Sequence, residues 1–443
     1  MELDSGSVPQ DFDDDSIPEI DLIVSSCHGL VTVDEESDVI RLVHYTTQEY
    51  FDRMQQQLFP EAETTITNVC TLYLTISNFY DAYESDYYYR HSEIVGKVQL
   101  DPFFGYACEN WGYHARAADS SSQIIHDFLA NDDKAKTAAL VLSHMQLYDA
   151  GRWELFEAHF LTALDLTAYF GLVDLIKKLP AILSITSLGA AELGKALFGA
   201  VSNKQSDALR VLLDLGAGVG AKNRWGEEPL ALAAKLGDVD AARLLLDYGA
   251  NLHTRSAGSE VAILKAASEG HTAVVRLLLE RGGNFSDRNE DNRSVVDYAV
   301  QSDNKTMIRD LFETTKPNRL EYLKELLLKA AVTYKHMECI KLVLDKDPPP
   351  KLRGNFGGRL LCIALTHHEP SMDIVRLLLK KGARPMQKGR YGKETILGKT
   401  NIDRQWLAAK IPSLFTGKRQ KYPHFSQNKH AGEKKAVYES LPR

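Results

Sequence analysis

Leucine and alanine recur at helical spacing through the middle of the chain, with polar residues between them. In residues 229–250 the apolar positions form two stripes, each on one face of a helix: Leu230, Ala233 and Ala234, then Ala241, Leu244 and Leu245. We predict two short antiparallel helices, with Gly237 at the turn between them and Gly249 just beyond the second helix. One pair cannot bury both faces, so neighbouring pairs are expected to stack.

This helix pair belongs to a repeat of 33 residues. The glycines with this spacing are Gly171, Gly237 and Gly270 at the turn, and Gly216, Gly249 and Gly282 after the second helix. A small-residue helix, a turn and a leucine-rich helix at this period resemble ankyrin repeats. The resemblance implies a mainly α fold, an ankyrin-repeat α-solenoid of about seven repeats over residues 156–385, with an eighth, partial repeat from Arg390 and a C-terminal cap to residue 411.

The repeats match the ankyrin consensus unevenly. The third repeat matches well, although Glu228 and Ala231 stand where threonine and histidine usually do. In the fifth repeat Asp303 replaces the turn glycine, and after the sixth the prolines at 348–350 cannot donate backbone hydrogen bonds. We therefore predict a distorted or less stable centre over residues 314–356.

The first third of the chain has a different pattern. Alternating apolar positions in residues 22–51 predict a short β-hairpin at 24–42 that runs into a helix. Together with residues 59–79 and the segment ACENWGYHA at 107–115, this order of motifs resembles fungal NACHT and ankyrin (STAND-type) proteins. The resemblance implies that residues 22–150 form a winged-helix remnant and a separate, mostly helical linker domain ahead of the repeats at 156–411.

The nucleotide-binding motif of that family is missing from this sequence. A P-loop needs the pattern G-x-x-x-x-G-K-[ST], whose amides and lysine hold phosphate. Gly398, Lys399 and Thr400 imitate its end, but Gly392 misses the first position by one residue. We expect no enzyme activity, no cofactor and no nucleotide site. The chain is interpreted as a shortened relative, an incomplete gene product or a fragment, and these three remain open.

Composition favours a soluble interaction protein. The 443 residues have a net charge of -8, which argues against general nucleic-acid affinity, and they lack an apolar run long enough for a membrane helix. Residues 1–21 include eight acidic side chains and no Lys or Arg, so we expect a disordered lead-in. Five scattered cysteines and no signal peptide predict a cytoplasmic protein with reduced thiols.

The C-terminal tail, residues 412–443, is basic. Its positive charges include Lys418, Arg419, Lys421, Lys434 and Lys435. These residues fit either a solvated flexible tail or a signal for nuclear import or an anionic partner, so a nuclear location is the alternative to a cytoplasmic one.

Other combinations of reactive residues lack the partners that their chemistry needs. Neither Cys27 with His28 nor the group at 367–369, His-His-Glu, has the second pair of ligands that a tetrahedral zinc site requires. Cys27 with His44 as base has no orienting carboxylate, so a buried structural thiol is the preferred interpretation. The tyrosines between positions 80 and 89 are interpreted as packing between helices, with a binding patch as the alternative. No catalytic or metal site is predicted.

Two functions follow from these observations. The first is a non-enzymatic scaffold that binds a protein partner, but no small molecule, nucleic acid or membrane, through its ankyrin surface. The second is the sensor or regulatory portion of a STAND-type NTPase switch. The expected contact residues lie at loop tips before the first helices, where side chains are free of core packing: Arg224, Trp225, His253, Arg255, Arg288 and Glu290. Trp225 has a second interpretation, as a brace for its own loop.

Overall fold

A computed structural model describes most of the chain between residues 31 and 383. The described residues are 31–34, 39–42, 49–50, 53–54, 57–76, 96, 98, 100–118, 122–150, 162–185, 187–223, 226–256, 260–352, 355–366 and 371–383. The chain divides into two compact units, Met1–Leu323 and Lys324–Arg443, and the division falls inside helix α18 (Pro317–Thr333).

Two short strands lie at the start of the described residues. Strand β1 (Val31–Asp34) pairs antiparallel with β2 (Val39–Leu42), with Val31 opposite Leu42 and Asp34 opposite Val39. Both strands fall inside the span 24–42 in which the sequence predicts a hairpin, whereas residues 24–30 and 35–38 lie outside the described residues.

Among the described residues, four helices with both ends assigned follow the strands. They are α3 (Ala62–Ile76), α5 (Pro102–Ala117), α6 (Gln123–Ala130) and α7 (Asp132–Ala150). Helix α5 begins where Asp101 Oδ1 accepts a hydrogen bond from the amide of Phe104, at 3.0 Å, and a proline fills its first position, which needs no donor. Helix α3 packs on α5 and α6, around the fully buried side chains of Trp111, Ile125 and Phe128.

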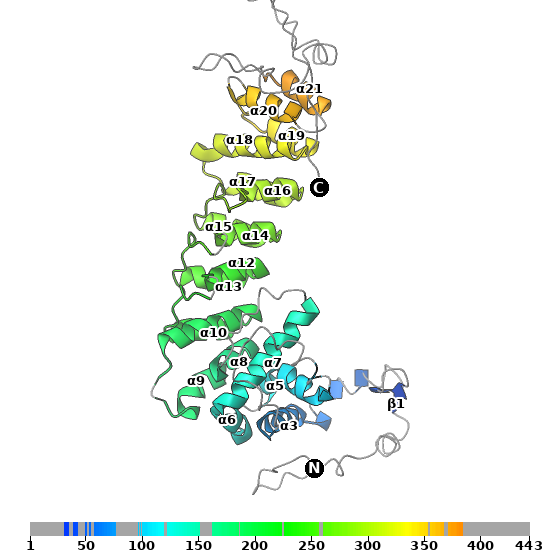
Figure 1. The fold of residues 1–443 in the computed structure, drawn as a ribbon, viewed down its shortest axis with the longest axis vertical. Helices are drawn as coiled ribbons and strands as arrows, with labels where there is room; N and C mark the ends of the chain where they lie inside the picture. Colours follow the sequence, from blue (N-terminus) through cyan, green and yellow to red (C-terminus); the bar gives the residue numbers. More distant parts are fainter. Residues whose placement is uncertain are drawn as a thin grey trace, which may run out of the picture. The chain divides into compact units, whose positions relative to one another are not determined.

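The rest of the first unit is a series of helix pairs (Figure 1). The pairs are α8 (Ala163–Phe170) with α9 (Val173–Ile182), α10 (Ala190–Ser202) with α11 (Ser206–Asp214), α12 (Pro229–Leu236) with α13 (Val239–Asp247), α14 (Ala262–Ser268) with α15 (Thr272–Glu280), and α16 (Val295–Gln301) with α17 (Lys305–Thr314). First helices pack on first helices and second helices on second helices of the neighbouring pairs. Both predicted stripes are therefore buried between neighbours.

The turn between the two helices of a pair has a left-handed residue in every one of these five pairs. These residues, spaced by 33, are Gly171 (φ 72°), Lys204 (φ 53°), Gly237 (φ 69°), Gly270 (φ 78°) and Asp303 (φ 49°). The prediction that Gly237 lies at the turn is confirmed, and its φ is positive. Asp303 adopts the conformation of the glycine that it replaces, although a residue with a Cβ is less stable there. The backbone conformation at the turn therefore repeats every 33 residues, although glycine does not occupy every one of these turn positions.

Polar contacts join the second helices of neighbouring pairs. Arg281 Nη2 lies 2.8 Å from Asp247 Oδ1, and the hydroxyl of Tyr248 donates a hydrogen bond to Asp214. In each contact the donor lies 34 residues after its acceptor, one repeat plus one position. The same position of the repeat therefore supplies the donor in both contacts.

The region in which the sequence predicts distortion departs from the regular repeat. Only residues 315–316 separate α17 from α18, and α18 is 17 residues long. In the second unit, α19 (Met337–Leu344) follows, then α20 (Asn355–Thr366), which packs on α21 (Met372–Lys380). Lys324 is buried and donates a hydrogen bond to the carbonyl oxygen of Pro348, so the proline segment supplies an acceptor where it cannot supply a donor.

The N-terminal helices pack directly against the first repeat helices of the same unit. Helices α5 and α7 contact α8, and α6 contacts α9. The rings of Trp111 and Phe170 meet edge to face with centroids 5.3 Å apart. A Cβ placed at Gly112 would lie 2.0 Å from Cγ of Phe170, so only glycine permits this approach. The segment ACENWGYHA therefore forms the contact with the first helix pair.

Candidate protein-binding surface

Three successive loops of equal length connect the helix pairs in the middle of the first unit. Residues 215–228, 248–261 and 281–294 each span 14 positions between a second helix and the next first helix. The connections on either side are shorter, with seven residues at 183–189 and two at 315–316. We name these three segments loops A, B and C, in chain order.

Each loop closes through hydrogen bonds between a polar residue and the residue four positions later. The closing residues, spaced by 33, are Asn223 in loop A, Ser256 in loop B and Asn289 in loop C. In loop C the Asn289 amide donates to the carbonyl of Arg293 at 3.1 Å, and the Arg293 amide donates to Asn289 Oδ1 at 2.9 Å. In loop B the Ser256 amide donates to the carbonyl of Glu260 at 3.0 Å. These hydrogen bonds connect the two ends of each four-residue step within its own loop.

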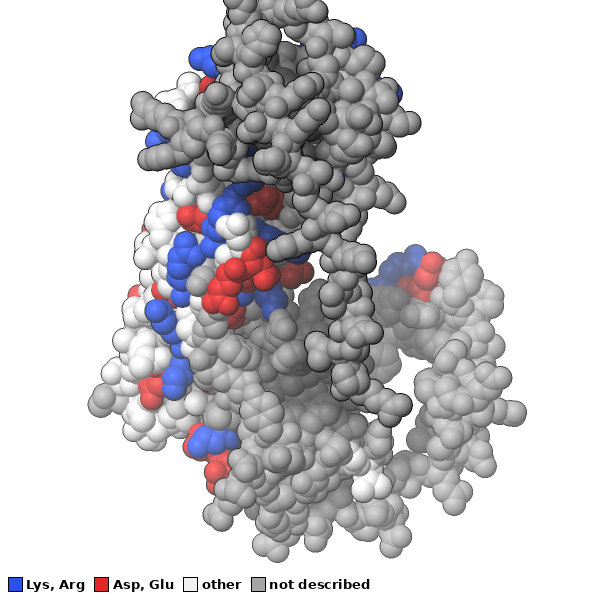
Figure 2. Space-filling model, turned by 45° about the horizontal axis from the view of Figure 1, so that its top comes forward, with Lys and Arg blue, Asp and Glu red and all other residues white. Residues whose placement is uncertain are grey.

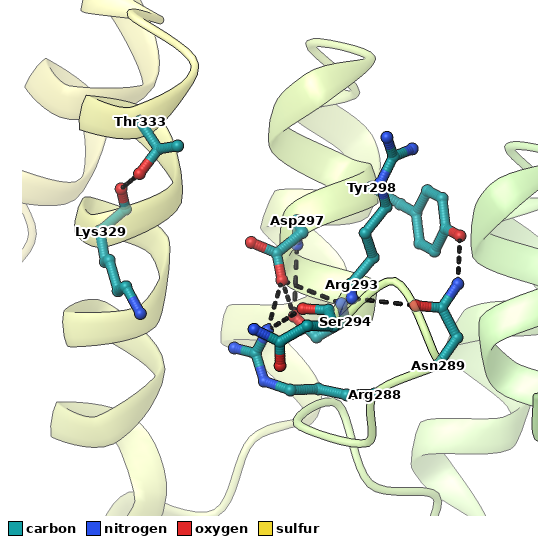
Figure 3. Close-up of polar contacts among 9 residues, drawn as sticks. Arg288, Asn289, Arg293, Ser294, Asp297, Tyr298, Lys329 and Thr333 are labelled. Atoms are coloured by element: carbon teal, nitrogen blue, oxygen red, sulfur yellow. Dashed lines mark hydrogen bonds and ion pairs between the residues drawn. The ribbon is translucent and has the colours of Figure 1, made fainter. Parts of the chain in front are cut away.

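A half-buried polar network connects the three loops. Lys265 Nζ, on α14, lies 2.6 Å from Glu227 of loop A and 3.4 Å from Glu260 of loop B. Asn289 of loop C donates to Glu260 at 3.4 Å and to the hydroxyl of Tyr298 at 3.1 Å (Figure 3). Burial disfavours the charged ammonium, but the two carboxylates outweigh it and raise the pKa of Lys265. The network holds neighbouring loops in a fixed arrangement.

Two of the six predicted contact residues, Arg224 and Trp225, lie outside the described residues. Two others, His253 in loop B and Glu290 in loop C, have exposed side chains. Arg255 is also exposed, and its Nη1 donates to the carbonyl oxygen of Arg288 at 3.1 Å. Arg255 therefore links loop B to loop C as well as facing solvent.

Arg288 is engaged within its own loop. Its Nη1 contacts Asp297 Oδ2 at 3.2 Å and donates to the carbonyl oxygen of Asn292 (Figure 3). Asp297 Oδ2 also accepts hydrogen bonds from the amide and hydroxyl of Ser294, at 2.9 and 2.7 Å, where α16 begins. Arg288 therefore acts as a brace for loop C. Figure 3 also shows a separate hydrogen bond within α18, which the hydroxyl of Thr333 donates to the carbonyl oxygen of Lys329.

One comparison with known proteins identifies the repeat. A family model for ankyrin repeats in three copies matches residues 164–256 and again residues 197–289. The chain contains ankyrin repeats. No curated protein matches the chain. The matched residues run from α8 into loop C, so loops A and B and the first part of loop C, to residue 289, belong to the ankyrin repeats that the family model detects.

The ankyrin loops expose charges of both signs. Loop B presents His253 and Arg255, and loop C presents Glu290 and Asp291. Figure 2 shows Lys and Arg side chains interleaved with Asp and Glu on the face in view. A surface with alternating charges suits a partner with its own paired charges, because both signs must be complemented.

Sequence reasoning missed the polar network beneath the loop tips. Glu227 and Glu260 occupy the same position in consecutive ankyrin repeats, and Asn223 and Asn289 share another position two repeats apart. The 33-residue register was therefore a usable signal for these residues. Lys265 had no such signal, because the equivalent positions are Leu232 and Tyr298.

The reactive groups, the tyrosine segment and the P-loop-like segment singled out in the sequence lie outside the described residues. Their positions are 27, 28, 44, 80–89, 367–369 and 398–400. Among the described residues, no group of three or more His, Cys, Asp or Glu side chains is placed to hold a metal ion. Burial raises the pKa of the Cys70 thiol to about 11 and raises that of Cys108 as well. Across the described ranges, every helix is too short or too polar to cross a membrane.

Proposed function

We propose that the chain is a non-enzymatic scaffold that binds a protein partner through loops A, B and C and the adjoining first helices. Ankyrin repeats serve in many unrelated proteins as protein-binding modules, so the partner depends on the exposed side chains of this chain. The proposed contact residues are Arg224, Trp225, His253, Arg255, Arg288, which also braces loop C, and Glu290, and we now add Asp291.

The observation that supports this proposal is the combination of hydrogen-bonded loop residues with exposed side chains in loops B and C. Hydrogen bonds close each loop, and Lys265 and Asn289 connect one loop to the next. At the tips, His253, Glu290 and Asp291 remain exposed. A partner that binds the described residues of this surface loses little conformational entropy in ordering them, because hydrogen bonds already hold them.

We also propose that the ankyrin array extends to about seven repeats and includes the helices of the second unit. The residues that precede the second helices share one register: Leu172, Gln205, Asp238, His271, Asn304, His336 and Ser371. Their spacing is 33 residues four times, then 32 and 35. The deviation begins where the loop between α17 and α18 shortens to two residues.

The test compares two variants of the full chain as immobilised baits in a host lysate, with the captured proteins quantified by mass spectrometry. The surface variant replaces His253, Glu290 and Asp291 by alanine. The matched control replaces Asp240 and Arg243, which are exposed on α13 away from the loops, by alanine. We expect the surface variant to lose proteins that the wild type and the control both retain, with unchanged circular dichroism. Equal capture by all three baits would reject the loop surface.

The alternative proposal is a sensor portion of a STAND-type NTPase switch whose nucleotide-binding module is supplied elsewhere. The contact of Trp111 and Gly112 with Phe170 favours it, because such a close contact can transmit movement of the N-terminal helices to the ankyrin repeats. The genomic sequence upstream of Met1 decides this point. An in-frame P-loop module there supports the switch, and its absence restricts the switch to a module on a partner chain.

A further inference from the structure

A small polar cavity lies between the third and fourth ankyrin repeats. Its volume is about 10 Å³, close to the minimum room of about 10–15 Å³ that one water molecule needs. Glu228 and Ala231 line it, and these are the two positions at which the third repeat departs from the consensus threonine and histidine. Because alanine is much smaller than histidine, the substitution leaves space beside the carboxylate.

The carboxylate of Glu228 is buried with one oxygen unsatisfied. Only 7% of Glu228 is exposed, and its Oε2 atom has no hydrogen-bond partner in the structure. Glu228 precedes α12 but its side chain forms no cap hydrogen bond. The equivalent Ser294 of the fifth repeat bonds reciprocally with Asp297. A buried charged oxygen without a partner is costly, so the site favours a ligand that satisfies it.

Oxygen atoms dominate the polar lining of this cavity. Besides Glu228, the polar residues that line it are Asn251, whose Oδ1 accepts a hydrogen bond from the amide of His253, Thr254 and Ser256. Ser256 Oγ donates its proton to the carbonyl of Glu260, at 3.0 Å. Lys265, a nearby ammonium, is engaged by Glu227 and Glu260. Oxygen ligands with one carboxylate suit a hard cation of single charge.

We propose that this cavity is a binding site for one monovalent cation of about the size of water, potassium or ammonium, with Glu228 as its charged ligand. The cation neutralises the buried carboxylate and connects loop A to loop B. The site is independent of the proposed protein partner, because it lies beneath the loops and its ligands are not the exposed tip residues.

The first test measures the melting temperature of the full chain in potassium chloride, ammonium chloride and choline chloride at equal ionic strength. Choline is too large for the cavity and controls for screening. We expect a saturable rise of about 1–3 °C with potassium or ammonium in the wild type. Glu228→Gln should abolish the rise, whereas Glu290→Gln, which removes an exposed carboxylate, should retain it.

A second variant restores the consensus by the double substitution Glu228→Thr and Ala231→His, which fills the cavity and removes the charge. It should melt in choline at or above the wild-type temperature and show no difference among the three salts. Identical wild-type melting in all three salts would overturn the proposal and leave the cavity to water. A rise that persists in Glu228→Gln would also overturn it, because the cation would then act elsewhere.

Discussion

The junction between α5 and α8 and the three ankyrin loops achieve order in opposite ways. At the junction, Trp111 and Phe170 are fully buried and meet through their rings, and Gly112 allows the two helices to approach. In the loops, order comes from hydrogen bonds and ion pairs at half-buried positions such as Lys265 and Asn289. The rings that carry the junction are buried, whereas loops B and C keep exposed side chains beside hydrogen-bonded residues. The first arrangement suits a permanent contact and the second suits recognition.

Replacing Trp111 by alanine should give the largest loss of stability. The change removes a fully buried indole that contacts both Phe128 and Phe170, so we expect a loss of about 3–5 kcal/mol in the free energy of unfolding. Urea denaturation measures it. The control, Tyr113→Phe, keeps the ring contact with Phe170 and removes only an exposed hydroxyl contact with Asn203. If both variants unfold at the same urea concentration, the junction does not stabilise the unit.

Gly112→Ala tests the close approach at the same junction. The new Cβ would overlap the ring of Phe170, so we expect a loss of about 2–3 kcal/mol. Gly218→Ala in loop A is the matched control, since a Cβ there meets nothing within 4 Å. If Gly112→Ala were as stable as the wild type, α8 could move away from α5 without a loss in the free energy of unfolding.

How much the sequence could predict differs between these two regions. The 33-residue period and the turn at Gly237 were predictable, because they depend on local helix spacing and on one backbone conformation. The contact between Trp111 and Phe170 was not, because it joins residues 59 positions apart and no local pattern records that packing. The residue type of Lys204 likewise gave no signal of its left-handed conformation, which only its place in the 33-residue register between Gly171 and Gly237 indicates.

The sequence allowed the exposed loop positions to be predicted, but not the role of each side chain there. The repeat register located the loop tips, and the structure confirms that His253 and Glu290 are exposed. The role of Arg288 could not be predicted, because it depends on hydrogen bonds to Asn292 and Asp297 that form only once the loop is closed. Charge alone does not distinguish a contact residue from a brace.

Lys265→Met should weaken the connection between loops A and B by about 2 kcal/mol at neutral pH, since it removes charged hydrogen bonds at a site where Lys265 is only 11% exposed. The raised pKa of Lys265 determines how this stabilisation depends on pH. The stabilisation is complete below the pKa of lysine in the unfolded chain, about 10.4, and is lost as the pH rises through the higher pKa of Lys265 in the folded protein. Urea titrations should therefore show the gap between wild type and variant closing in strong alkali. A gap independent of pH would assign the loss to packing.

Comparing Gly237→Ala with Gly270→Ala separates backbone strain from contact between repeats. Both glycines have positive φ, so both variants share the cost of a Cβ in that conformation. Only at Gly237 would the Cβ meet another repeat, 2.5 Å from Nδ1 of His271, whose ring is held by a 3.0 Å contact with the carbonyl of Lys235. We expect Gly237→Ala to be less stable than Gly270→Ala by about 1 kcal/mol in urea melts. Equal stability would show that the turn conformation alone requires glycine.

The smallest effect is expected at the ion pair of Arg281 with Asp247, which connects second helices of neighbouring ankyrin repeats. Its 2.8 Å separation is close to that of Lys265 with Glu227, yet 35% and 50% of the two side chains are exposed. Solvent screens such a pair, so a double-mutant cycle with Arg281→Ala and Asp247→Ala should give a coupling of about 0–0.5 kcal/mol, vanishing at high salt. The Lys265 pair should keep most of its coupling in the same salt, because its partners are half-buried. If the two cycles gave equal couplings, burial would not be what distinguishes the loop network from the outer contacts.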